Sequence, residues 1–467
     1  MKATEPIRFA VRALLVLATV AWQADETLAQ APEPEPAAEP EASKTDDEET
    51  WLTTDATRKD ASFVATATET LSRDPRNYFA DEEFHQGWIR IPGMPAEVRF
   101  GGFIQLNLVH DFQAAGLSTG EFIPSLIPVP TDLTPNTNFD VQSTRFIFES
   151  RIKVDKAWTK VSRVPREWVS VFLSMDFAGD TSASTPVPRL RQAYVTYSGL
   201  LVGRALGTFF DAQTWPDIFD LEGPNAMTAK RTEMVRFSYG IVQTADVQVP
   251  DKVIVTAAIE NPETSVTNAT NLKAWPGVVA RLDLNYDWGH MSFMGIGRQL
   301  IAESTAGVGR DSQYAGSGAV NWKINIPGSQ ARTASAPSDD LLGQVAYGTA
   351  GGNYIQDLVA LGGQDGYFDD VTQQILTQRQ LAAWGGYEHS WADRWHSAFM
   401  AGYILVSNLD LEPDDAYQSS IYALTNIIFR PIPRFAIACE YYFGQRRDKD
   451  GQRGNAHRLM GVFKFTI

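Results

Sequence analysis

The chain has 467 residues, of which 44% are hydrophobic and 11% aromatic, and its formal net charge is -16. This acidity excludes a nucleic-acid binder, because such proteins present a basic face to the phosphates. A helical membrane protein is also excluded, since the chain lacks the several runs of roughly 20 apolar residues that such a protein needs.

The N-terminus has the pattern of a secretory signal peptide over residues 1–29. Basic residues precede an apolar stretch that runs from Ala13 to about Trp22, and small residues follow near Ala29. About ten apolar residues are too few to anchor the chain in a bilayer as a helix. We therefore expect cleavage near Ala29 and export from the cytoplasm.

Residues 30–87 are expected to form a short, disordered periplasmic extension of the mature chain. Residues 30–50 include the Pro/Glu-rich stretch APEPEPAAEPEASKTDDEET, which cannot bury a core and predicts a disordered linker. Residues 51–87 are polar, and we interpret them as a periplasmic N-terminal segment and not as a catalytic domain.

From residue 88 to 467 the hydrophobic pattern alternates with the period of two that is typical of β-strands. In FGGFIQLNLVHDF, for example, Ile104, Leu106 and Leu108 share one face, with Gln105 and Asn107 opposite. Several runs reach roughly 9–11 residues and carry aromatic residues near an end, as strands that cross an outer membrane do. An exported soluble β-sandwich would share the alternation but not these two features.

The connections between these strands support the same interpretation. Short turns such as FRPIPRF alternate with stretches that we expect to be long loops, such as Gln113–Asn138 and Ser304–Ser317. Dividing about 370 residues by about 23 per strand and connection predicts roughly 16 strands. The predicted fold class is therefore all-β, a transmembrane antiparallel β-barrel over residues 88–467.

The last stretch, RLMGVFKFTI, places Leu459, Phe463, Phe465 and Ile467 on one face. An apolar terminal strand at the edge of a soluble sheet would invite mispairing. The closing strand of a barrel pairs with the first strand and has no free edge. We therefore expect this face to point to lipid.

Arginines in strand-like segments are the candidate residues of a solute pathway. A charged side chain on the lipid face costs roughly 2–4 kcal/mol at mid-membrane, so we expect these guanidinium groups to point inward. There they would attract anions and bind carboxylates bidentately. Alternatively, they pair with lumen acids such as Asp176, Glu260 and Asp283 and are structural. The candidates are Arg145, Arg189, Arg191, Arg204, Arg231, Arg236, Arg281 and Arg298. Arg458 lies in a strand-like segment of the same kind and is also expected to point inward. Arg189 and Arg191 are two apart and share a strand face.

The stretch FDLEGPNAMTAKR, residues 219–231, carries the turn signals Gly223 and Pro224. It folds inward as a constriction element or lies on the surface as a plain loop, and its sequence fits both. An enzyme is not expected, since the histidines show no metal-ligand spacing and neither a GxSxG stretch nor a phosphate-binding glycine loop is found. We accordingly expect no cofactor and no metal.

Several stretches resemble the DcaP-like porin family, in order, over roughly residues 88–467. They are IRIPGMPAEVRFGGFIQL, SMDFAG, RLRQAY, TFFDAQTWPDIFDLEGPNA, RTEMVRF, WPGVVARLDLNYDWGHM, YGTAGGNYIQDL, GGYEHSWADRW and EYYFGQRRDKDGQRGNAHRL. The resemblance implies a trimeric, sixteen-stranded outer-membrane porin that passes small anions, dicarboxylates among them, through an arginine-lined constriction. Within RLRQAY, Gln192 stands where the family usually has a histidine.

Together these observations predict a porin for passive diffusion of small anionic solutes in the outer membrane of a Gram-negative-type bacterium. The expected partners are the solutes, outer-membrane lipid and further copies of the same chain in a homotrimer. Two alternatives stay open. One is a specific channel for sugars or aromatic acids, and the other is a structural or adhesive barrel that its own loops plug.

Overall fold

The computed structural model describes residues 88–153, 168–179, 185–197, 199–242, 252–273, 275–286, 288–326 and 339–467. The predicted signal peptide, linker and periplasmic segment fall within residues 1–87 and lie outside the described residues. Their boundaries therefore stay predictions.

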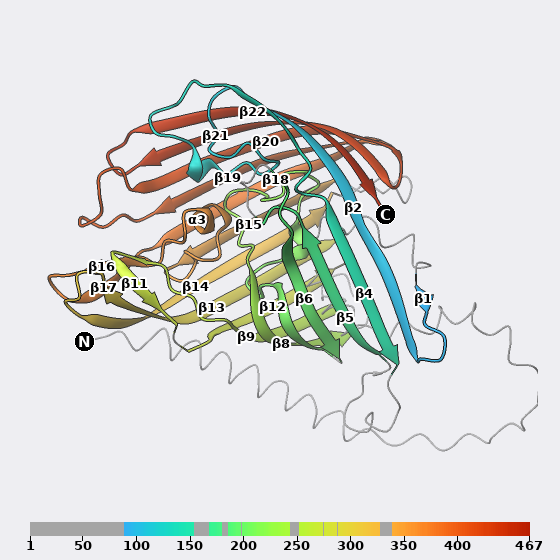
Figure 1. Ribbon diagram of the computed structural model, residues 1–467, viewed down its shortest axis with the longest axis horizontal. Coiled ribbons are helices and arrows are strands. Elements are labelled where there is room, and N and C mark those ends of the chain that lie inside the picture. Colours follow the sequence, from blue (N-terminus) through green and yellow to red (C-terminus); the bar gives the residue numbers. More distant parts are fainter. Residues whose placement is uncertain are drawn as a thin grey trace, which may run out of the picture. The chain divides into compact units, whose positions relative to one another are not determined.

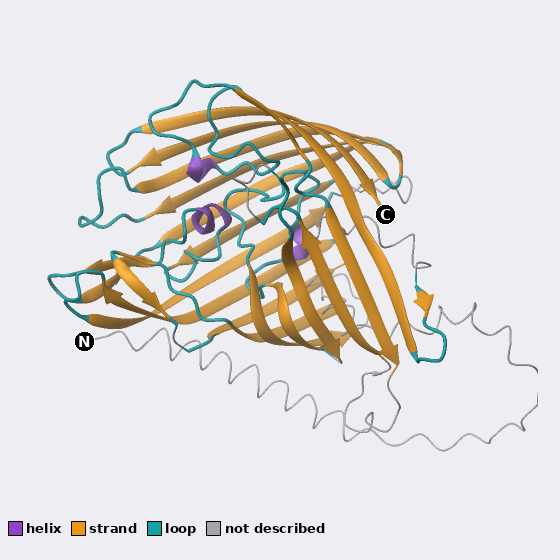
Figure 2. Ribbon diagram, in the orientation of Figure 1, coloured by secondary structure: helices purple, strands orange, loops and turns teal. Residues whose placement is uncertain are grey.

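Sixteen antiparallel strands form a closed barrel, which confirms the predicted fold class and strand number (Figures 1 and 2). The strands of the wall are β2 (Ala96–Asp111), β4 (Arg145–Lys153), β5 (Trp168–Asp176), β6 (Arg189–Tyr197), β7 (Leu200–Leu206), β8 (Arg231–Val242), β9 (Lys252–Glu260), β12 (Gly277–Tyr286), β13 (Gly289–Ser304), β14 (Arg310–Asn325), β15 (Asp340–Gly348), β18 (Gln380–Ala392), β19 (Trp395–Val406), β20 (Tyr417–Ile432), β21 (Phe435–Asp448) and β22 (Arg453–Thr466).

Smaller elements extend the wall or lie in its connections. The strands β1 (Ile89–Arg90) and β3 (Asn136–Asp140) pair with β2, and β11 (Ala269–Leu272) pairs with β13. A separate three-stranded sheet contains β10 (Val266–Thr267), β16 (Gly366–Asp369) and β17 (Gln374–Thr377). The helical turns are η2 (Pro124–Leu126), η4 (Ala212–Thr214) and α3 (Gln356–Ala360). Among the described residues, no helix has the length and apolar character that crossing a membrane requires.

The barrel closes where β22 meets β2. Residues Phe103–Asp111 of β2 pair with β22, while Ala96–Phe103 pair with β4 on the other side. The backbone N–H of Ile467 also donates to the carbonyl oxygen of Gly102 at 2.9 Å. The C-terminal strand therefore has partners on both sides, as its sequence predicts.

The two faces of β22 confirm the predicted alternation. Leu459, Phe463 and Phe465 are each at least 40% exposed on the outer face, whereas Arg458 and Val462 are buried on the lumen face. The same inside–outside alternation runs along the other long strands. Because the period of a strand is two, one register places every second side chain toward the lumen.

Among the connections that the structure describes, those at one end of the barrel are short turns, and most of those at the other end are long loops. Two residues join β18 to β19 and β20 to β21, whereas residues 112–135 and 207–230 form long connections at the opposite end. The expected loop at Ser304–Ser317 is wrong, because β13 runs to Ser304 and Glu303 pairs with Arg310. The Gly- and Ser-rich composition predicts a loop, but most of this stretch belongs to β14. Its backbone groups form hydrogen bonds with β13 in a hairpin.

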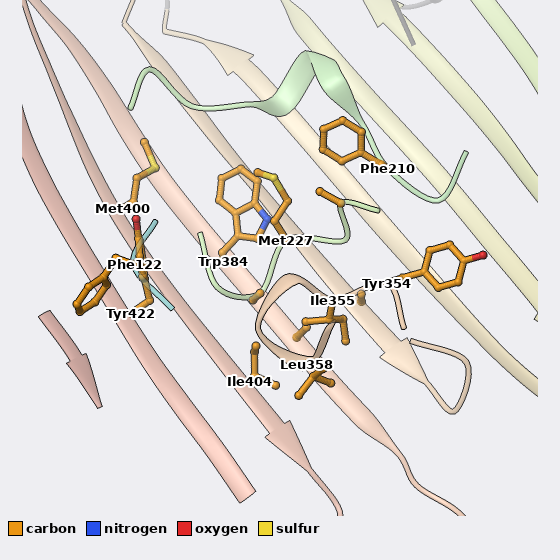
Figure 3. Packing of buried hydrophobic residues seen from close by; sticks show 14 of the residues in the cluster. Phe122, Phe210, Met227, Tyr354, Ile355, Leu358, Trp384, Met400, Ile404 and Tyr422 are labelled. Carbon is orange, nitrogen blue, oxygen red and sulfur yellow. The ribbon is translucent and has the colours of Figure 1, made fainter. Parts of the chain in front are cut away.

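Three of the long loops fold into the barrel. We name them loop A (residues 112–135), loop B (residues 207–230) and loop C (residues 349–379), which contains α3. Their apolar side chains pack on lumen-facing residues of the wall (Figure 3). Phe122 comes from loop A, Met227 from loop B and Leu358 from loop C, and the wall contributes Trp384 and Tyr422. The inward alternative for FDLEGPNAMTAKR is therefore the one that the fold adopts.

Candidate functional site

Three arginines converge on one aspartate on the lumen side of β4, β5 and β6. Arg145 begins β4, Asp176 ends β5 and Arg189 begins β6. Arg189 donates two hydrogen bonds to Asp176, from Nε to Oδ1 at 2.9 Å and from Nη2 to Oδ2 at 3.0 Å. Arg191 Nε and Arg145 Nη2 lie 3.2 Å and 3.5 Å from Asp176 Oδ2. We call these four residues the arginine cluster.

The pairing of β5 with β6 explains how Arg189 and Arg191 reach the same carboxylate. Asp176 pairs with Arg189 and Ser174 pairs with Gln192, but the register shifts between them. This shift leaves Arg191 as an extra residue of β6, and an extra residue re-aims side chains locally. Arg189 and Arg191 lie on one face, as their spacing predicts, and the shift allows Gln192 to face the lumen as well.

The arginine cluster carries more positive than negative charge. Three guanidinium groups, which stay protonated in proteins, surround one carboxylate, and Glu121 Oε1 of loop A lies 3.9 Å from Arg189 Nη2. Arg145 is fully buried and Arg191 nearly so, whereas the side chain of Arg189 is 32% exposed. Because charges interact more strongly where water is excluded, an anion that reaches Arg189 also experiences the field of the other two arginines.

Two uncharged polar side chains of β5 and β6 lie next to the arginine cluster on the lumen side of the wall. Ser174 and Gln192 face the lumen and are buried. The Oγ of Ser174 and both amide atoms of Gln192 find no hydrogen-bond partner among the described residues. Since buried polar groups in proteins are normally hydrogen-bonded to protein or water, these two side chains suit water or a polar solute that extends from the arginine cluster.

Arg281 of β12 is bound to acids and to loop B. Its guanidinium contacts Asp211 of loop B at 2.8 Å and Asp283 of β12 at 2.5 Å, and it donates to the carbonyl oxygen of Phe210. His290 Nε2 lies 2.8 Å from Asp211. Among the described residues, Asp211, Asp283 and His290 are the group spaced closely enough to hold a metal ion. The guanidinium already bonds both carboxylates, so the arrangement is that of an ion-pair network.

Arg298 contacts loop C and the connection that follows β9, whereas Arg236 contacts the end of β7. Arg298 of β13 forms an ion pair with Asp365 of loop C and donates to the carbonyl oxygen of Ala350 at 2.8 Å. It also donates to the carbonyl oxygen of Glu263 at 2.9 Å. Arg236 of β8 is buried and donates to the carbonyl oxygen of Leu206 at 3.1 Å. The structural alternative for lumen arginines therefore describes Arg281 and Arg298 well.

Arg204 and Arg231 do not point into the lumen, and this correction follows from strand parity. Arg204 pairs with Glu233 on the outer face at 2.6 Å, where the two side chains are 36% and 54% exposed. Arg231 shares that face because it is two residues from Glu233, whereas Arg236 faces inward. Arg231 and Arg236 are five residues apart on one strand, so the sequence spacing already excludes a shared face.

Two cations of β22 also line the lumen: Arg458, which its strand-like segment predicts to point inward, and Lys464, which was not among the candidates. Arg458 binds Asp111 at 2.6 Å and donates to the carbonyl oxygens of Thr119 and Glu121, both at 2.8 Å, so it holds loop A. Lys464 Nζ lies 4.0 Å from the ring centroid of Phe103. The even-numbered face of RLMGVFKFTI contains both residues, so the alternation alone identifies them as lumen-facing.

Three buried carboxyl groups connect the inward loops to each other and to the wall. Asp357 of loop C accepts hydrogen bonds from the backbone of Ser125 in loop A at 2.9 Å and from Ser420 in β20 at 3.1 Å. Asp220 of loop B accepts from the backbone of loop A at 3.3 Å and from a tyrosine of β20 at 2.9 Å. Glu440 of β21 accepts from the backbone of loop B at 3.0 Å. Among the described residues, no cation forms an ion pair with any of the three.

Burial changes the protonation of the two loop carboxyls. Burial raises the pKa of Asp220 to about 8, and the nearby Glu440 acts in the same direction. Burial also raises the pKa of Asp357 well above its ordinary value, with Asp220 adding to the effect. A carboxyl group without a cation beside it is more stable neutral in such surroundings. We call Asp220, Asp357 and Glu440 the carboxyl latch.

Comparison with known proteins supports the fold. No protein-family model matches the chain, and no curated protein matches it. The structure is similar to the outer membrane channel DcaP of Acinetobacter baumannii, with a TM-score of 0.67, 18% sequence identity, and coverage of 81% of this chain and 99% of that chain. An anion-selective porin from Comamonas acidovorans has a TM-score of 0.49 and 10% identity, with coverage of 80% of this chain and 100% of that chain. The resemblance to DcaP is thus confirmed as a likeness of fold.

Proposed function

We propose that this protein is an outer-membrane porin through which small anions, dicarboxylates in particular, diffuse passively. In this proposal the mature chain follows export by its N-terminal signal peptide and assembles as a homotrimer. The fold of an outer-membrane channel supports the location and the class of protein. No chemical step is involved, because an electrostatic gradient along the lumen suffices to select and move ions.

The arginine cluster is the observation that carries the anion selectivity. Arg189 offers an exposed guanidinium to the lumen, and Arg145 and Arg191 add their charges from behind it. A guanidinium matches the two oxygens of a carboxylate, and its charge does not depend on pH in the physiological range. In this proposal Arg281 and Arg298 hold loops B and C, which narrow the passage.

Planar-bilayer recordings of the detergent-purified mature protein test this proposal. Replacing both Arg189→Ala and Arg191→Ala removes two of the three positive charges of the arginine cluster. We expect the reversal potential in a salt gradient to move toward that of a cation-selective pore, and the current block by added succinate to weaken. Three-step closures of the wild-type channel would support the trimer.

Arg204→Ala is the matched control, because it removes an arginine from the outer face of the same part of the wall. This variant should keep the wild-type reversal potential. If the double variant also keeps it, the arginine cluster does not select the ions. Steady wild-type pores that ignore succinate would retain the porin and reject dicarboxylates as its solutes.

A plugged structural barrel is the second candidate, and the packing of the loops favours it. Loops A, B and C bury apolar side chains against the lumen wall from β18 to β20 (Figure 3). If this packing closes the lumen completely, the reconstituted protein should conduct no ions at any voltage that the bilayer tolerates. Such silence in correctly folded protein would replace the porin proposal.

A further inference from the structure

Asp176 differs from the other lumen acids in the number of cations that it contacts. Its carboxylate is within 3.5 Å of three guanidinium groups, and its side chain is 1% exposed. It occupies the bidentate position on Arg189, the most exposed of the three. An incoming carboxylate would seek this same hydrogen-bonding geometry.

A channel must bind its solute strongly enough to admit it and weakly enough to release it. Three guanidinium groups in a partly dry site would hold a dianion tightly if no internal acid opposed them. One carboxylate fixed at their centre cancels one of the three charges and engages Arg189 from the protein side. The position of Asp176 thus weakens the binding of a solute anion, while the remaining positive charge of the cluster still attracts it.

We infer that Asp176 is the specificity-determining residue of the arginine cluster, acting as an internal counter-ion that sets how tightly and for how long an anion binds. This inference rests on the proposed anion pathway and deepens it. It assigns to Asp176 a function in solute release that is separate from the attraction that the arginines supply.

A purely structural function for Asp176 is the competing explanation, since Arg145 is fully buried and needs a negative charge nearby. The variant Asp176→Asn keeps the size of the side chain but leaves three positive charges. The double variant Asp176→Asn with Arg145→Met returns the cluster to its wild-type net charge and leaves Arg189 and Arg191 in place. It therefore separates the effect of charge from the effect of the lost contact with Arg145.

Two measurements on each full-length mature variant provide the test. Calorimetric titration of the detergent-solubilised barrel with succinate gives the equilibrium affinity, and bilayer recording gives the reversal potential and the duration of succinate blocks. We expect Asp176→Asn to bind succinate more tightly, to block for longer and to be more anion-selective. We expect the double variant to return toward wild type in all three.

Glu149→Gln is the control, because Glu149 is a lumen acid of β4 that pairs with Arg99 at 2.6 Å instead of with the cluster. It should leave all three quantities unchanged. Unaltered affinity in folded Asp176→Asn, or tight binding that persists in the double variant, would overturn the inference. A wild-type protein that conducts no current would reject the porin, while the titration would still decide whether Asp176 weakens anion binding.

Discussion

The lumen arginines differ in how many acidic side chains contact each of them. Arg189 shares Asp176 with two other arginines, whereas Arg281 contacts two acids, Asp211 and Asp283, and is almost completely buried. A buried ion pair contributes little net stability when both partners are present, but losing one partner leaves a charge without compensation. We therefore expect substitution of Arg281 to lower the stability of the barrel, and substitution of Arg189 to change the binding of the solute.

Arg281→Met is expected to destabilise the barrel. The change leaves two buried carboxylates without their cation, and removing one partner of such a pair costs about 3–5 kcal/mol. Loop B also loses its hydrogen bond through the carbonyl oxygen of Phe210, so the open-channel conductance should rise. The midpoint of thermal unfolding in detergent and the single-channel conductance measure the two effects.

Arg204→Met supplies the comparison for this prediction. Its pair with Glu233 lies beside loop B at the ends of β7 and β8, and the two side chains are 36% and 54% exposed. An ion pair between exposed side chains contributes at most about 1 kcal/mol. The unfolding midpoint of this variant should remain near that of the wild type. Equal destabilisation by the two substitutions would show that burial of Arg281 does not determine its contribution.

At the scale of the elements, the inward loops are held by ion pairs and also by buried carboxyl groups that have no cation beside them in the described part of the chain. The carboxyl latch links loop A to loop C through Asp357 and loop A to loop B through Asp220. Both loops B and C also reach β20 through these residues. The latch thus ties three segments that are distant in sequence to one part of the wall.

The stability of this arrangement should fall as the pH rises. The pKa of Asp220 is raised by burial to about 8 in the folded state, above its value in the unfolded chain. A raised pKa contributes stability that is fully present below about pH 4 and is lost as the pH rises through about 8. One such proton changes the free energy of unfolding by at most about 1.4 kcal/mol per pH unit.

Thermal unfolding of the wild type and of Asp220→Asn between pH 4 and pH 9 measures this effect. The wild-type midpoint should decrease across the range, and the variant should show a smaller decrease because its amide does not titrate. The pKa of Asp357 is also raised by burial, so this group contributes its own pH dependence, and the slope should be reduced and not abolished. An identical slope in the two proteins would contradict the assignment to Asp220.

At the scale of the whole molecule, closure of the barrel decides where each side chain of β22 points. The strand pairs with β21 on one side and β2 on the other, and Phe463 projects outward between Leu459 and Phe465. No edge is exposed along the paired stretch Phe103–Asp111 of β2. Insertion of the barrel into lipid therefore depends on the outer face of this last strand.

Phe463→Arg should impair folding into bilayers. A charged residue on the lipid face of a barrel costs about 2–4 kcal/mol at mid-membrane and less toward the interface. Phe463 lies three residues from the end of β22, so we expect a part of this cost. Phe463→Leu keeps an apolar side chain at the same place and should fold normally. The folded fraction, measured by the heat-modifiable mobility of the barrel in electrophoresis after refolding into vesicles, distinguishes the variants, and equal fractions would argue against a lipid-facing Phe463.

Local alternation was sufficient to determine the barrel class, the outward face of the terminal strand and the common face of Arg189 and Arg191. These features depend on the period of two of a β-strand. This period can be recognised from neighbouring residues alone, without information on contacts between distant parts of the chain. The same rule also excludes a shared face for Arg231 and Arg236, so their spacing in the sequence is enough to show that one of the two cannot line the lumen.

Only the tertiary structure decided which acids meet which arginines and which loops enter the lumen. Asp176 reaches Arg145 because β4 and β5 are neighbours in the wall, and Asp357 reaches Ser125 because loops A and C pack inside the same barrel. A loop folds inward when its apolar and polar groups find partners across the lumen, and those partners lie far away along the chain. Pairwise contacts of this kind leave no periodic pattern in the sequence. The division of the arginines between the proposed solute pathway and the loop contacts therefore depends on the closed barrel.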